Sequence, residues 1–146
     1  MNFEKEMNEY SAVILAEKGN DIPVFSETKS PHSKFAHFIF TDGEKLEGKV
    51  YELYAYQVGT VVAHLSDQIP VEKIYTKQLS EPGKEVLDKL GISYEYEELI
   101  PLAKSSKNRE VDCPLEKSLL GLSHGEALQS LRERFGDTAE GNSCKV

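Results

Sequence analysis

The chain has 146 residues with 17 basic and 25 acidic side chains, a net charge of −8, 39% hydrophobic residues and two cysteines. This length suits one globular domain with its own core, and the negative charge argues against nucleic-acid binding through a basic surface. No apolar stretch is long enough for a membrane span or a signal peptide, and no disulfide framework is expected from two cysteines. We therefore expect a cytoplasmic protein whose partner is a small molecule or another protein.

The first third of the chain predicts a hairpin and a helix. Apolar runs at residues 11–16 and 22–25 are separated by turn residues, which indicates a β-hairpin. Residues 33–40 have apolar positions at helical spacing, although their β-rich composition leaves a strand possible. The next helix begins either at Lys49 or, after an extended segment, only near Gly59, because a glycine would interrupt a longer helix.

The middle of the chain predicts a strand–helix–strand unit. Residues 73–79 are rich in β-forming side chains, and Ser80 is placed to cap a helix that ends at Gly91. Residues 92–96 alternate as a strand does. Strands that alternate with helices in one domain indicate a three-layer α/β fold with helices flanking the sheet.

The C-terminal part predicts two further helices. A polar loop at residues 103–112 leads to a helix over residues 113–120, and Ser123 begins a capping box for the last helix. We expect residues 1–136 to form a single domain and residues 137–146 to form a disordered tail.

Residues 43–50 match a phosphate-binding loop, G-x-x-x-x-G-K, at all but the last position. That position is Val50, which has no hydroxyl for Mg²⁺, and Glu44 and Glu47 would bring negative charge to an anion site. The segment is therefore interpreted as a polar turn.

The metal-binding and nucleophile patterns that sequence can show are missing. Zinc needs three or four convergent ligands, and the histidines have no ligand spacing, while neither cysteine belongs to a C-x-x-C pair. The four histidines are His32, His37, His64 and His124. We expect no metal and no cofactor, and we interpret His37 and His64 as packed side chains.

Cys113 is the most informative single residue. It precedes Pro114, a favoured first-turn residue, so its sulfur is expected at a helix N-terminus, where the helix dipole would lower the thiol pKa. Arg109, four residues upstream, would add to that field. The more common interpretation is a small buried hydrophobic residue, which free cysteines usually are.

Residues 80–101, the pair Asn108–Arg109 and residues 113–117 resemble the family called domain of unknown function 1893, within a likeness that covers residues 8–122. The resemblance implies a cytidine-deaminase-like fold with a mixed sheet flanked by helices. Deaminases of that superfamily hold zinc at the starts of two successive helices, with a glutamate that moves protons. Here those helix starts fall near residues 59–61 and 80–83, and neither carries a ligand set.

The resemblance therefore implies a zinc-free domain that binds a small polar or nucleoside-related ligand without deaminase activity. The residues expected to line that site are Ser80, Asn108, Arg109, Cys113 and Glu116. This sequence departs from the family pattern at Thr60, where the family has lysine, and at Leu115, where it has methionine. Two alternatives stay open: an enzyme that uses Cys113 as nucleophile or redox thiol, with Glu116 beside it, and a non-catalytic protein that dimerises through an apolar helix face.

Overall fold

The structure, a computed structural model of the chain, describes residues 12–20, 22–27, 31–105, 108 and 110–136. Arg109 and the tail predicted at residues 137–146 lie outside these described residues. None of the helices in the described part is long and apolar enough to cross a membrane.

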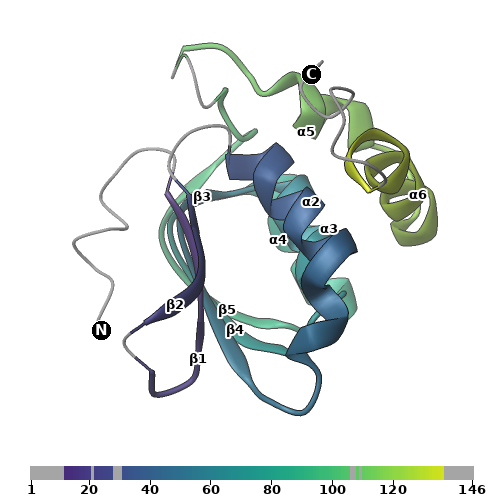
Figure 1. The fold of residues 1–146 in the computed structure, drawn as a ribbon. Helices are drawn as coiled ribbons and strands as arrows, with labels where there is room; N and C mark the ends of the chain where they lie inside the picture. The colour runs from purple at the N-terminus through teal and green to yellow at the C-terminus, as the bar shows by residue number, and fades with distance from the viewer. Residues whose placement is uncertain (1–11, 21, 28–30, 106–107, 109, 137–146) are drawn as a thin grey trace.

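Five strands form one mixed sheet (Figure 1). In spatial order they are β2 (Pro23–Glu27), β1 (Val13–Glu17), β3 (Tyr51–Val58), β4 (Val71–Ser80) and β5 (Ser93–Ile100). The β1 strand runs antiparallel to both of its neighbours, so the predicted hairpin is confirmed. The β3, β4 and β5 strands are parallel, and their carboxyl ends therefore lie at one edge of the sheet.

Helices join these strands. They are α2 (Pro31–Asp42), the short 3-10 helix η1 (Gly43–Leu46), α3 (Thr60–Ser66), α4 (Glu81–Leu90), α5 (Pro114–Leu119) and α6 (His124–Phe135). Figure 1 shows α2, α3 and α4 beside the sheet and α5 and α6 beyond them. The predicted α/β class, a mixed sheet flanked by helices, is confirmed.

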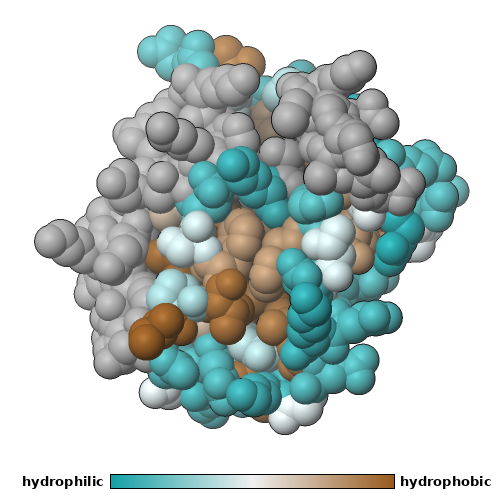
Figure 2. All heavy atoms as spheres, in the orientation of Figure 1, coloured by the Kyte–Doolittle hydropathy of each residue, from teal (hydrophilic) through white to brown (hydrophobic). Residues whose placement is uncertain are grey.

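One large apolar core joins the sheet to the helices. Leu53 and Ile74 from the sheet, Leu87 from α4 and Phe135 from α6 are all fully or almost fully buried in it. A smaller cluster of Ile14, Ala16 and Tyr54 lies apart from this core. Figure 2 shows apolar side chains between the sheet and the helices, surrounded by hydrophilic ones.

Residues 33–40 and the segment after Gly48 each had two possible secondary structures, and the structure shows which one each adopts. Residues 33–40 belong to the helix α2, as their apolar spacing indicates. The segment after Gly48 is a strand followed by a helix, because β3 pairs with β1 and β4 along its length and Gly59 is the N-cap of α3. Strand pairing therefore decides between two patterns that periodicity alone left equal.

The phosphate-loop pattern at residues 43–50 lies in a different context from a phosphate loop. It follows the helix α2 and precedes the strand β3, whereas a phosphate loop follows a strand and opens a helix. The interpretation as a polar turn agrees with this arrangement.

Candidate functional site: the junction at the start of α3

The helices α3 and α4 begin side by side at the carboxyl ends of β3 and β4. A Cβ atom added to Gly83 would lie 2.9 Å from the Cα of Gly59, so the two backbones are in direct contact. In open α/β sheets, ligands commonly bind at the carboxyl ends of the strands. In this protein that position is closed by the contact between two glycines.

Ser80 caps α4, as the sequence predicts. Its side chain is fully buried, and its Oγ accepts a hydrogen bond of 3.0 Å from the backbone N–H of Gly83. The Gly91 residue that ends α4 has the left-handed conformation that favours glycine. The hydroxyl that is expected to face a ligand thus also holds the start of a helix.

Glu116 is a buried carboxylate, with 1% of its surface exposed. Its Oε1 accepts hydrogen bonds from the Thr60 backbone N–H and, at 2.9 Å, from the Thr60 hydroxyl. Its Oε2 accepts a bond of 2.8 Å from the Ala103 backbone N–H. Because the start of a helix has free N–H groups and a partial positive charge, an anion is favoured there. Glu116, from α5, thus caps α3 from a distance of 56 positions in the sequence.

A second pair of contacts attaches the 103–112 loop to the end of β3. The Gln57 side chain donates to the Lys104 carbonyl at 2.9 Å and accepts from the Lys104 N–H at 2.8 Å. The Cys113 N–H donates to the Ala103 carbonyl at 2.8 Å. These bonds place residues 103 and 104 beside α3 and orient Ala103 toward Glu116.

Cys113 is the N-cap of α5, so its predicted position at a helix start is confirmed. The expected lowering of its pKa is wrong. Only 6% of the residue is exposed, and burial raises the pKa of the thiol more than the N–H groups of Glu116 and Leu115 lower it. Desolvation disfavours the thiolate, and here it outweighs the helix dipole.

The structure brings three of the five predicted site residues to one junction. Ser80 reaches it through the Gly83–Gly59 contact, and Cys113 and Glu116 reach it through Ala103. Asn108 is exposed, and its Oδ1 accepts a turn bond of 2.9 Å from the Glu110 N–H. Within the described residues, no buried side-chain nitrogen or oxygen lacks a partner, so the junction is internally satisfied.

The other end of α3 carries a histidine pair that the sequence did not reveal. His64 Nδ1 lies 2.8 Å from His124 Nδ1, and the two rings are stacked with their planes inclined by 20°. His124 Nε2 lies 3.0 Å from Asp67 Oδ2. Since a carboxylate only accepts, His124 donates from Nε2 to Asp67, and one of the two Nδ1 atoms donates to the other.

His64 is the buried member of this pair, with 3% of its surface exposed. Burial, with a smaller contribution from His124, lowers the pKa of His64 to about 4. The interpretation of His64 as a packed side chain is therefore confirmed, and the pair holds α6 against α3 while His64 is neutral. Across the described part of the chain, no three His, Cys, Asp or Glu side chains converge as a metal site would require.

Together, the fold and the junction define an α/β domain in which the carboxyl end of a parallel strand pair is closed by a carboxylate of the same chain. The sequence model of the domain of unknown function DUF1893 matches residues 3–135, and the chain belongs to that family. None of the curated proteins compared with the chain matches it.

A solved structure of a DUF1893 family protein from Thermotoga maritima shares this fold. Its TM-score is 0.70 at 23% sequence identity, over 91% of this chain and 84% of the other. The likeness extends over nearly the whole chain, so the described architecture is that of the family's fold.

Proposed function

We propose that this protein is a cytidine-deaminase-like domain that binds a small polar ligand, nucleoside-related compounds included, and does not deaminate it. The order of the elements supports the comparison, since α3 and α4 follow successive parallel strands and begin side by side. Those are the helix starts that carry zinc ligands and the proton-moving glutamate in the deaminases which the sequence resembles.

The single observation that supports the absence of deamination is the bonding of Glu116. Zinc in a deaminase lowers the pKa of its bound water, and it needs three protein ligands with lone pairs free to bind it. At these two helix starts the chain has Thr60 and Ser80, with no cysteine or histidine, and both Glu116 oxygens already accept hydrogen bonds. The donor set does not fit zinc, so no step is assigned to it.

The proposal is tested by metal analysis together with an absorbance assay for deamination of cytidine. We expect less than stoichiometric zinc and no turnover by the full chain. Stoichiometric zinc that is lost in Glu116→Gln, accompanied by cytidine turnover in the unmutated chain, would overturn the proposal. Thermal shift against nucleosides and nucleotides tests the ligand, because a ligand that binds only the native state raises the melting temperature.

The alternative enzyme, with Cys113 as nucleophile or redox thiol, receives less support from the same geometry. The thiol is buried and its pKa is raised, so we expect iodoacetamide to label Cys113 slowly near neutral pH. Rapid labelling at neutral pH would favour that enzyme instead. The predicted homodimer stays a prediction, and concentration-dependent light scattering tests it.

A further inference from the structure

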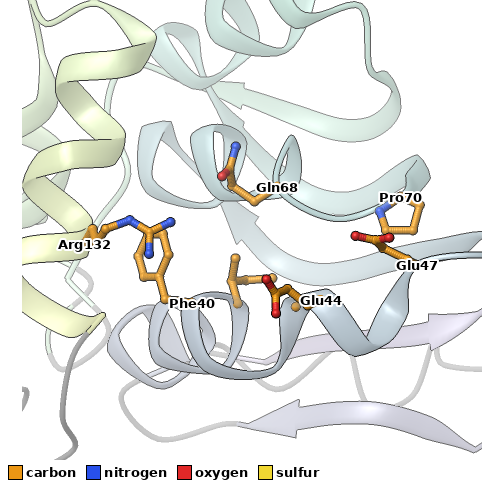
Figure 3. A pocket seen from close by; sticks show the side chains of 8 residues that line it. Phe40, Glu44, Glu47, Gln68, Pro70 and Arg132 are labelled. Atoms are coloured by element: carbon orange, nitrogen blue, oxygen red, sulfur yellow. The ribbon is translucent and has the colours of Figure 1, made fainter.

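A pocket of about 270 Å³ lies where α6 packs against α2, away from the junction (Figure 3). Its walls come from the end of α2, from η1, from the turn before β4 and from Arg132 of α6. Part of the wall is the segment that resembles a phosphate loop, including Gly43, Glu44 and Glu47. Drug-sized ligands occupy roughly 300–1,000 Å³, so this volume suits a smaller molecule.

Charged side chains of both signs line the pocket: Arg132 is cationic, and Glu44 and Glu47 are anionic. Figure 3 shows the Arg132 guanidinium over the ring of Phe40, and its Cζ lies 4.5 Å from the ring centroid. Such a contact orients the planar guanidinium without neutralising its charge. Its remaining N–H donors can therefore bind a carboxylate.

Glu44 and Glu47 supply the negative side. Both side chains are exposed, and among the described residues neither they nor Arg132 form an ion pair. Gln68 adds an amide that can donate and accept. Two carboxylates against one guanidinium leave the pocket with an excess of negative charge, which is opposite to what a phosphate requires.

The geometry points to a binding site for an amino acid with a cationic side chain. Its carboxylate would pair with Arg132, and its ammonium groups would pair with Glu44 and Glu47. The size, the two signs of charge and the excess of one carboxylate all match such a ligand. This inference goes beyond the proposed function, because the pocket lies away from the junction and takes a different class of ligand. The metal, deamination and nucleoside assays test the proposed function separately.

The test is an NMR titration of the ¹⁵N-labelled full chain with L-lysine, acetate and butylammonium at low ionic strength, where surface charges are least screened. We expect L-lysine to shift the amide signals of Glu44, Gln68 and Arg132 with saturation, and to bind at least about tenfold more tightly than either single-charge probe, because charge-assisted bonds form at both ends. Equal binding of butylammonium or acetate, or no saturable shift with L-lysine at these signals, overturns the inference.

Variants with matched controls locate the site. We expect Arg132→Gln and the double variant Glu44→Gln/Glu47→Gln each to weaken L-lysine binding about tenfold. Arg134→Gln on the same helix and Glu81→Gln/Glu85→Gln on α4 change charge equally outside the pocket, and should leave the affinity within about twofold. An equal loss of L-lysine affinity in the control variants would mean that binding depends only on net charge, and it would overturn the proposed site.

Discussion

The two ends of α3 are held by different chemistry. At its start, the carboxylate of Glu116 accepts bonds from the backbone and hydroxyl of Thr60 and from Ala103. At its end, the ring of His64 is hydrogen-bonded to His124, which in turn bonds to Asp67. One end thus depends on a buried charge with several donors, whereas the other depends on a side chain that must stay uncharged. The seven-residue helix α3 is too short to be stable alone and is held by tertiary contacts at both ends.

The largest effect is expected from Glu116→Ala. The change leaves the N–H groups of Thr60 and Ala103 buried without an acceptor, so the free energy of unfolding should fall by about 3–5 kcal/mol. Glu116→Gln keeps the volume and one oxygen and should lose less. Urea unfolding measures both variants, and equal stability of Glu116→Ala and the unmutated chain would mean that the carboxylate does not hold α3.

The next effect is a pH dependence at the other end of α3. Because the pKa of His64 is lowered from 6.5 to about 4, the unfolded state binds the proton more readily than the native state. The contribution of neutral His64 to the free energy of unfolding is complete above pH 6.5 and is lost as the pH falls toward about 4. At 1.36 kcal/mol per pKa unit, the loss is as much as roughly 3 kcal/mol.

The matched control for that pH dependence is His37→Gln against His64→Gln. The part-buried His37 bonds to the Phe135 carbonyl at 2.9 Å and lies outside the pair. Urea unfolding between pH 4 and 7 should show that the free energy of unfolding depends less on pH in His64→Gln than in His37→Gln, because only His64 belongs to the pair. An unchanged slope in His64→Gln would assign the pH dependence to other groups.

A smaller loss in the free energy of unfolding is expected from Gly59→Ala, which tests how tightly Gly59 packs against Glu116 and Ala103. The added Cβ would clash with Glu116 Oε1 and lie 2.8 Å from the Ala103 Cβ, so the junction must shift, at a cost of about 1–3 kcal/mol. Gly125→Ala in α6 is the control, because its Cβ meets nothing within 4 Å and alanine favours a helix by about 0.5–1 kcal/mol. The melting temperature should therefore fall in Gly59→Ala and rise in Gly125→Ala.

The smallest effects are expected from removing the N-caps of α4 and α6, the two helices next to the ends of α3. Ser80 caps α4 beside Gly59, and Ser123 caps α6 beside His124. Replacing either serine by alanine should cost about 1 kcal/mol, with Ser80→Ala the larger loss because its hydroxyl is buried. A larger loss for the exposed Ser123 would show that the histidine pair depends on the exact start of α6.

Much of the fold could be predicted because its signals are local. Ser80 bonds three residues ahead to Gly83, and Ser123 and Glu126 bond reciprocally across the same spacing, so a short stretch of sequence contains both partners. Gly91 follows the last turn of α4 with the left-handed conformation that ends helices. Each of these features depends on neighbours along the chain and appears where the sequence analysis expected it.

The candidate site was less predictable because its partners are distant. Glu116 and Cys113 were expected in one site, but burial gives Cys113 a raised pKa instead of a lowered one, and the Glu116 oxygens are bonded within the chain. His64 and His124 are 60 positions apart, and no spacing rule joins them. Arg132 and Glu44 line one pocket only because α6 packs against α2.

By itself, the sequence determined the α/β class, the hairpin, the caps and the ends of α4 and α6, since these follow from periodicity and from bonds across a few residues. The tertiary structure alone decided that residues 51–58 form a strand, that Glu116 closes the start of α3 and that the pair His64–His124 secures its end. Strand pairing, burial and long-range hydrogen bonds depend on which distant segments pack together, and the order of residues along the chain does not specify that packing.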